Sequence, residues 1–123
     1  MRYLLDTHTL LWWLSDKNKL NSAELKVLND SDTTIFLSSV VIWEISVKSS
    51  LNKLDIPINY FKELEKSSFV PLPISHKHAL KIAKLPHIHH DPFDRLLIAQ
   101  AQIEKLALLT QDRIIKKYTV KTI

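Results

Sequence analysis

Cysteine and glycine are both absent from the 123 residues of the chain. Without cysteine there is no disulfide, no thiolate zinc site and no cysteine nucleophile. Without glycine the chain cannot form a dinucleotide-binding fingerprint, a Walker A loop or a G-x-S-x-G nucleophile elbow, because each needs glycine in its turn. Turns must instead be built on Asn, Asp, Ser and the five prolines. These two absences exclude several large enzyme classes.

Long apolar runs are also missing. No run approaches the roughly 20 residues of a membrane-spanning helix, and Asp6 interrupts the N-terminal segment where a signal peptide needs continuous apolar sequence. Lys and Arg number 17 against 13 Asp and Glu, and the net charge of +4 permits polyanion binding without demonstrating it. We expect a single domain over residues 1–123, soluble, cytoplasmic and not bound to membranes.

Short apolar runs alternate with segments of helical periodicity. The predicted strands are residues 3–6, 33–37, 69–72, 106–109 and 118–122. The predicted helices are a segment from Thr7, residues 22–29 behind a serine cap, a segment from Ser39 to Leu51, residues 59–67, residues 76–84 and a long helix from Asp91 to about Glu104. This alternation predicts an α/β fold in which helices cover both faces of a parallel sheet. Ligands of such sheets bind at the carboxyl ends of the strands.

Four of the acidic residues have mainly apolar neighbours. They are Asp6, Glu44, Asp94 and Asp112. Burying a carboxylate is costly unless it is paired or bound to a metal. Asp6 ends the first strand and Asp112 closely follows a central one, so both should lie at the same edge of the sheet. Because helices start at that edge, Glu44 and Asp94 can join them. Asp55 has a similar setting but ends no predicted strand.

Each of the four acids also has a purely structural explanation. Asp6 and Asp112 can cap the helices that follow them. Glu44 can pair with Lys48 on an exposed helix face. Asp94 fits the first turn of the helix opened by D-P-F-D, where an acid favours the positive end of the helix dipole. Their joint occurrence at one edge is less easily explained in this way.

Four close carboxylates repel one another unless a cation neutralises them. Oxygen ligands in a chain without cysteine favour Mg²⁺ or Mn²⁺. Such ions can bind a phosphodiester, lower the pKa of an attacking water and stabilise the leaving oxygen. The acidic cluster and the basic overall charge together predict hydrolysis of phosphodiester bonds.

Four segments, in order, carry a resemblance to a known family. They are LLDTHTLLWWL, SSVVIWEISVK, HHDPFDRLLIAQA and LLTQD. Nearly end to end, the chain resembles the PIN-domain family, and in particular the VapC-type toxins of type II toxin–antitoxin pairs. The resemblance implies a three-layer α/β/α domain with a central parallel sheet and a Mg²⁺- or Mn²⁺-dependent endoribonuclease activity. It also implies products with 5′-phosphate and 3′-hydroxyl ends, an RNA substrate, a cognate antitoxin and a homodimer.

The resemblance extends to single residues. Asp6 matches the first-strand metal ligand, Glu44 the acid of the W-E helix, Asp94 the acid of the P-F-D-R helix and Asp112 the fourth acid, and all four are expected to be catalytic metal ligands. Thr7 and Thr110 are expected to hydrogen-bond the ligands or the phosphate.

Arg95 is our candidate for a contact to a substrate phosphate, with a salt bridge to Asp91 as the alternative. Where relatives carry a glycine before K-L, this chain has Asn52, which tolerates a left-handed helix end.

Other polar and aromatic residues have weaker functional interpretations. His87, His89 and His90 resemble a zinc cluster but have no clear fourth ligand, so a loop before the Asp94 helix is the preferred interpretation. His8 can transfer protons, although local packing is preferred. A solvated helix face is the preferred interpretation of the basic stripe Lys77, Lys81 and Lys84. Base stacking is possible for the three tryptophans, but packing in the core or in a dimer is preferred for Trp12, Trp13 and Trp43.

Two other classes of protein remain as alternatives. A phospho-accepting receiver domain needs an acceptor Asp at the end of a central strand, and FVPLPIS offers none. A non-catalytic PIN-fold binding module remains possible, although a dead site has no reason to keep four mutually repelling acids. The RNA target, the antitoxin's identity and the number of ions stay open.

Overall fold

Four parallel strands form the sheet at the centre of the computed structural model, which describes residues 1–123. The strands are β1 (Arg2–Leu5), β2 (Thr34–Ser38), β3 (Val70–Leu72) and β4 (Ala107–Leu109). Their order in the sheet is β3-β2-β1-β4, and Leu4 of β1 lies opposite Phe36 on one side and Leu108 on the other. The predicted α/β fold with a central parallel sheet is confirmed.

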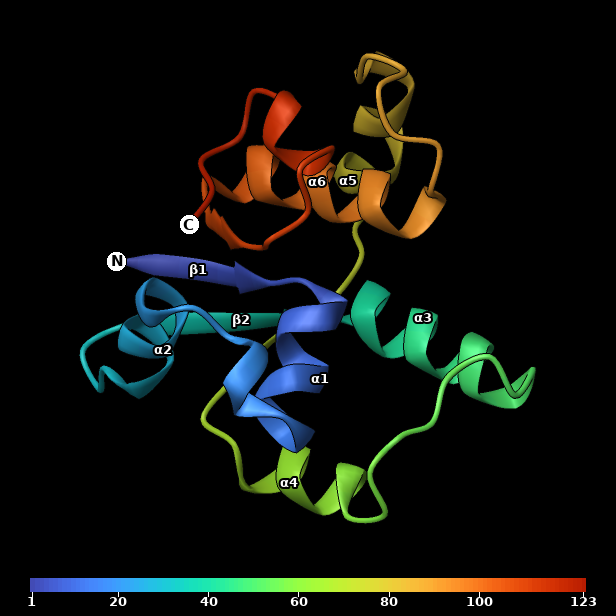
Figure 1. Cartoon of the computed structure of the whole chain (residues 1–123). Helices are drawn as coiled ribbons and strands as arrows, with labels where there is room; N and C mark the ends of the chain where they lie inside the picture. The colour runs from blue at the N-terminus through green and yellow to red at the C-terminus, as the bar shows by residue number, and fades with distance from the viewer.

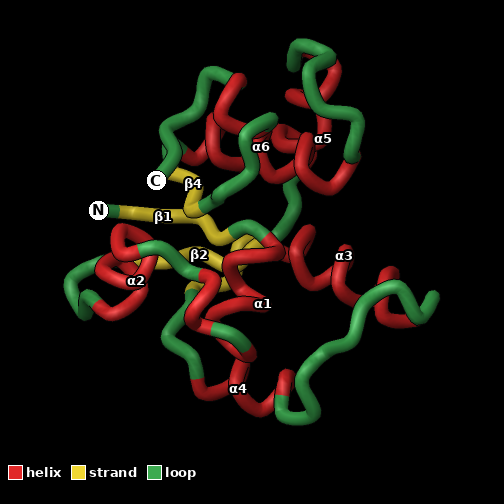
Figure 2. Tube along the Cα trace, in the orientation of Figure 1, coloured by secondary structure: helices red, strands yellow, loops and turns green.

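Helices flank the sheet on both sides. They are α1 (Thr7–Ser15), α2 (Ser22–Asn29), α3 (Ser39–Ser50), α4 (Tyr60–Lys66), α5 (His76–Lys81) and α6 (Pro92–Glu104), with short 3₁₀ turns η1 (Lys17–Lys19), η2 (Ile82–Lys84) and η3 (Ile115–Lys117). Figure 1 shows α5 and α6 grouped on one side of the strands and α1, α2 and α4 on the other. Figure 2 shows how short the strands are beside the helices and loops around them. None of the helices combines the length and apolar character needed to cross a bilayer.

The core follows from the apolar runs of the strands. Leu4, Leu5, Leu108 and Leu109 are all fully buried, because strands of a parallel sheet are covered on both faces. Ile98, also fully buried, comes from α6. Each of these runs ends where the polar residues of the candidate site begin.

Two residues replace glycine at left-handed positions of the backbone. Asn52, just after α3, has φ 55°, as the sequence predicts. Lys105 has φ 56° and ends α6, which we did not predict. One cap also differs from the prediction, since the side chain that caps α2 belongs to Asn21 and not to the serine that follows it.

Two predicted elements are wrong in part. Residues 118–122 form no strand, only a single bridge between Leu108 and Thr122. The chain turns tightly there, since the amide of Val120 donates to the carbonyl of Tyr118. The predicted helix 76–84 ends as α5 at Lys81 and continues only as the 3₁₀ turn η2.

Candidate active site

Two of the four predicted acids lie at adjacent strand ends. Asp6 follows β1 and Asp112 follows β4 by a few residues, and the amide of Asp6 donates to the carbonyl of Leu109 at 3.2 Å. Asp6 also caps α1, because its carboxylate accepts the amide of Thr9 at 2.8 Å. Asp6 therefore caps α1 and also lies at the acidic edge of the sheet.

The same two acids share a pocket of about 300 Å³. Its lining residues are Asp6, His8, Trp12, Gln111 and Asp112. The rings of His8 and Trp12 lie 5.8 Å apart between centroids and are tilted by 32°. The pocket thus combines two carboxylates with an aromatic wall.

Glu44 is buried on α3, with 4% of its surface exposed. The hydroxyl of Thr7 donates to one carboxylate oxygen at 2.5 Å, and Lys48 lies 2.5 Å from the other. The i,i+4 pair with Lys48 therefore exists, but the acid does not lie on an exposed face. Hydrogen bonding to the charged side chain of Glu44 accounts for a raised pKa of Lys48, which burial opposes.

Asp94 lies in the first turn of α6 but does not cap it. The cap is Asp91, whose carboxylate accepts the amides of Phe93 and Asp94 at 2.8 and 3.1 Å. Burial raises the pKa of Asp94 to about 7, with further increases from the negative charges of Asp91, Glu44 and Asp112, and His89 opposes them. Three other acids therefore lie close enough to Asp94 to disfavour its charge.

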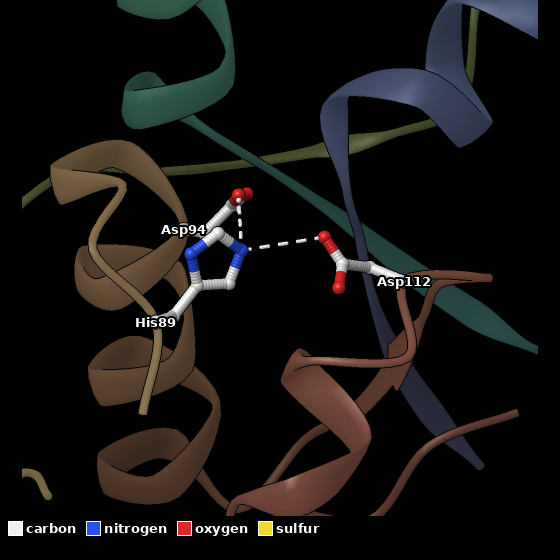
Figure 3. A group of neighbouring side chains, drawn as sticks. All are labelled: His89, Asp94 and Asp112. Carbon is white, nitrogen blue, oxygen red and sulfur yellow. Dashed lines mark hydrogen bonds and ion pairs between the residues drawn. The ribbon is translucent and has the colours of Figure 1, made fainter. Parts of the chain in front are cut away.

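A histidine lies between two of these acids. His89 Nε2 is 3.0 Å from a carboxylate oxygen of Asp94 and 3.3 Å from one of Asp112 (Figure 3). The donor atoms of the three side chains all lie within 4.8 Å of one another. The sequence predicts His89 as a loop residue, with a histidine cluster or a contact to RNA as the other interpretations, and it does not predict the place of His89 between the acids because that place depends on the fold of residues 82–91.

The pKa values of the two strand-end acids are shifted in opposite directions. Burial raises the pKa of Asp6, and hydrogen bonds from Thr110 and Thr9 counteract part of the increase. Burial acts in the same sense on Asp112, but hydrogen bonds from the amides of Ile115 and Ile114 and from His89 outweigh it and lower its pKa. The carboxylate of Asp112 thus fixes the turn that leads into η3, but the N-cap position of η3 is Ile114 and has no side-chain cap, so Asp112 is not the helix cap that its structural explanation predicts.

The two predicted threonines both contact the acids. Thr7 donates to Glu44, and Thr110 contacts Asp6 and accepts the amide of Asp112 at 3.0 Å. Thr110 is fully buried, so its hydroxyl fixes the turn that carries Asp112. Both threonines therefore contact acids that are predicted to bind metal, and their role toward a ligand or a phosphate stays a prediction.

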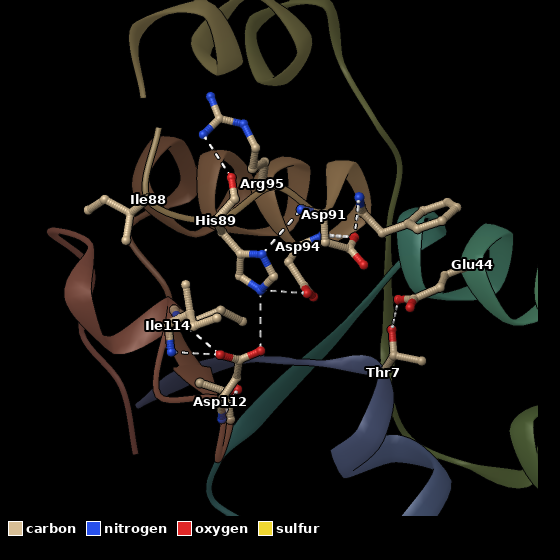
Figure 4. Close-up of polar contacts among 12 residues, drawn as sticks. Thr7, Glu44, Ile88, His89, Asp91, Asp94, Arg95, Asp112 and Ile114 are labelled. Carbon is tan, nitrogen blue, oxygen red and sulfur yellow. Dashed lines mark hydrogen bonds and ion pairs between the residues drawn. The ribbon is translucent and has the colours of Figure 1, made fainter. Parts of the chain in front are cut away.

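Arg95 does not face the acids. Its guanidinium donates to the carbonyls of Pro86 and Ile82 at 2.8 and 3.1 Å and to the hydroxyl of Tyr118 at 3.2 Å. Figure 4 shows the side chain directed away from Asp94 and Asp112. It is 8% exposed, so the structure does not bring it to the site as a contact for phosphate.

One buried acid was missed by the sequence analysis. Glu24 of α2 is fully buried and accepts from the side chains of Gln111 at 2.6 Å and Thr9 at 3.3 Å. It therefore holds Gln111, the residue next to Asp112, in place. The pattern Asn21-x-x-Glu24, a capping box, was the sequence feature that marked it.

The residues of this edge suit a divalent cation. Asp6, Glu44, Asp94 and Asp112 offer carboxylate oxygens, which are the ligands that Mg²⁺ and Mn²⁺ prefer. Of the four, only Asp94 and Asp112 belong to the close group of donor atoms, together with His89, and neither Asp6 nor Glu44 is part of it. A cation there would favour the carboxylate form of Asp94, whose pKa is raised first by burial and then by the charges of neighbouring acids.

An α/β domain with an acidic cluster at the carboxyl edge of its parallel sheet is the class that these observations define. The PIN domain family model matches residues 3–121, and the chain belongs to that family. No curated protein matches the sequence significantly.

Several solved structures share the fold. The chain is similar to one in the crystal structure of VapBC2 from Rickettsia felis bound to a DNA fragment from their promoter, with a TM-score of 0.75, 18% identity, and coverage of 100% of this chain and 98% of that one. For DNA-bound VapBC from Salmonella typhimurium the TM-score is 0.72, the identity 17% and the coverage 100% and 97%. For a toxin-antitoxin complex from Klebsiella pneumoniae the TM-score is 0.61 and the identity 20%, and the match covers 89% of this chain and 86% of that one.

Proposed function

We propose that this protein is a Mg²⁺- or Mn²⁺-dependent endoribonuclease and the toxin of a type II toxin–antitoxin pair. The observation that carries the proposal is the convergence of carboxylates from β1, α3, α6 and the turn after β4 at one edge of a PIN fold. Members of the PIN domain family are generally nucleases. Because the acids come from four separate elements, helix capping alone does not account for all of them.

In this proposal Asp6, Glu44, Asp94 and Asp112 hold the ion. When bound, the ion supplies a Lewis acid that activates water and neutralises charge on the phosphodiester. The chain's own contribution is to fix the ligands, through Thr7 on Glu44 and Thr110 on Asp6 and Asp112. Preorganised ligands spare the site the cost of rearranging during the reaction.

The pocket beside Asp6 and Asp112 supports RNA as the substrate. His8 is exposed and Trp12 is half-buried, so their rings can stack an unpaired base next to the phosphate at the acids. Stacking requires a base that is out of a duplex, which favours single-stranded RNA.

The antitoxin is proposed from the similar structures. One is described as a toxin-antitoxin complex, and two are VapBC assemblies solved with DNA. Exposed apolar side chains that a partner or a second copy could cover include Trp43, Leu51, Ile58 and Phe61. Cytoplasmic location and a homodimer remain part of the same proposal.

The test is cleavage of a mixed RNA substrate by antitoxin-free protein with Mn²⁺ or with EDTA. Beside the wild type we would assay Asp94→Asn and, as a matched control, Asp55→Asn, which changes an exposed acid outside the cluster. We expect Mn²⁺-dependent cleavage by the wild type and the control, and a loss of at least 100-fold in Asp94→Asn.

The chemistry of the product ends provides a second readout. Hydrolysis by water should leave 5′-phosphate and 3′-hydroxyl ends, whereas attack by the RNA's own 2′-hydroxyl, the route of common contaminating ribonucleases, leaves 5′-hydroxyl ends. Full activity of Asp94→Asn would contradict the proposal. Absence of both cleavage and Mn²⁺ binding would favour a non-catalytic binding module.

A further inference from the structure

His89 belongs to no assigned set of ligands, yet its ring lies between two of the four acids, Asp94 and Asp112. Nε2 is 3.0 Å from Asp94 and 3.3 Å from Asp112, and the ring connects α6 to the turn after β4 (Figures 3 and 4). These distances fit either a hydrogen bond or two ligands on a common ion. The other nitrogen of the ring decides between the two.

Nδ1 of His89 accepts the backbone amide of Asp91 at 3.2 Å. An acceptor nitrogen carries no hydrogen, so the hydrogen of the ring is on Nε2. Nε2 is therefore a donor toward the two carboxylates. A histidine that binds a metal must instead present a lone pair at the ligating nitrogen.

The backbone around His89 is fixed as firmly as its ring. The amide of His89 donates to the hydroxyl of Tyr118 at 2.6 Å, and the same hydroxyl accepts from Arg95 at 3.2 Å. The side chain of His89 is only 12% exposed. The ring is thus held between the acids by contacts on three sides.

We propose that His89 is a placeholder for the divalent ion: it donates to Asp94 and Asp112 in the metal-free protein and competes with metal for them. The inference rests on the proposed metal site. One donor shared by two carboxylates reduces their repulsion and holds the turn that carries Asp112 against α6. Metal binding at these oxygens then requires the ring to move away, and its hydrogen bonds are lost as the ion enters.

The test is calorimetric titration of EDTA-stripped protein with Mn²⁺ at one fixed pH. The proteins are the wild type, His89→Ala, His89→Gln and His90→Ala, the last changing an exposed neighbour in the same loop. His89→Ala removes the competitor, so its Kd for Mn²⁺ should fall roughly threefold to tenfold. His89→Gln, whose amide keeps a donor, and His90→Ala should stay within twofold of the wild type.

Thermal unfolding, with and without Mn²⁺, gives a second measurement of the same competition. His89→Ala should melt below the wild type in EDTA, and the difference should shrink at saturating Mn²⁺, where the ion replaces the ring. Weaker Mn²⁺ binding by His89→Ala would overturn the inference and make His89 a ligand. An unchanged Kd would also overturn it. If none of the four proteins binds Mn²⁺, the metal site itself fails, and this inference with it.

Discussion

Asp94 shows how position in the fold sets the chemistry of one side chain. In a first helical turn an acid is normally favoured as a carboxylate by the helix dipole. Burial and the charges of Asp91, Glu44 and Asp112 outweigh that preference and raise its pKa to about 7. A group in this state is stable when neutral or when a cation lies beside it.

The raised pKa of Asp94 has a measurable consequence for stability. Between pH 4 and pH 7 the unfolded chain has released the proton that folded Asp94 still holds, so the free energy of unfolding falls as pH rises. We expect Asp94→Asn to remove this part of the decline. The measurement is urea denaturation in EDTA across that range.

Asp55→Asn is the control for this series, because the acid that it removes is exposed. Subtracting the unfolding free energy of Asp94→Asn from that of the wild type cancels the contributions of the other titrating groups and leaves that of Asp94. If that difference does not change between pH 4 and pH 7, the carboxyl of Asp94 is not the proton-binding group.

At the scale of elements, the geometry of α6 directs Asp94 and Arg95, which are neighbours in sequence, to different sides of the helix. Successive side chains on a helix point about 100° apart, so Arg95 cannot face the acids while Asp94 does. Adjacency in sequence suggested a phosphate contact for Arg95. Its guanidinium instead holds carbonyls of the segment that carries His89, including those of Pro86 and Ile82.

Arg95→Met should therefore destabilise the protein by about 1 to 3 kcal/mol, because it leaves several partly buried carbonyls without their donor. Metal-free RNA binding should change little. Urea denaturation and RNA binding by fluorescence anisotropy measure the two effects, with Arg113→Met, at an exposed arginine, as the control. Normal stability with much weaker RNA binding would favour the original interpretation of Arg95 as a phosphate contact.

What the sequence predicts correctly depends on local pattern. Strand ends follow from apolar runs, and a parallel sheet brings strand ends to one edge, so the positions of Asp6 and Asp112 were predictable. The left-handed turn at Asn52 was predictable for the same local reason. The place of His89 was not, because it depends on Tyr118, which lies 29 residues away and fixes its amide. The chain also turns tightly after Tyr118, where the amide of Val120 donates to its carbonyl, so the strand predicted over residues 118–122 does not form.

At the scale of the molecule, charge is distributed unevenly. The chain is basic overall, with a net charge of +4, yet Glu44, Asp91 and Asp112 lie close enough to Asp94 to act on its charge. Such a distribution attracts a polyanion to the surface while it leaves the site itself selective for cations. Unfavourable repulsion therefore exists at the site in the metal-free protein, and the proposed ion would relieve it.

Mn²⁺ should therefore raise the melting temperature, since a ligand of the folded state alone stabilises it by about 2.7 kcal/mol at 100 times its Kd. For a chain of this size that is roughly 8 to 16 °C. Protons and Mn²⁺ compete for Asp94, whose pKa is about 7, so at a fixed Mn²⁺ concentration the shift should be larger at pH 8 than at pH 5. Scanning calorimetry at both pH values measures it, with Asp94→Asn as the variant expected to lose most of the shift. A shift independent of pH and retained in Asp94→Asn would place the ion elsewhere on the protein.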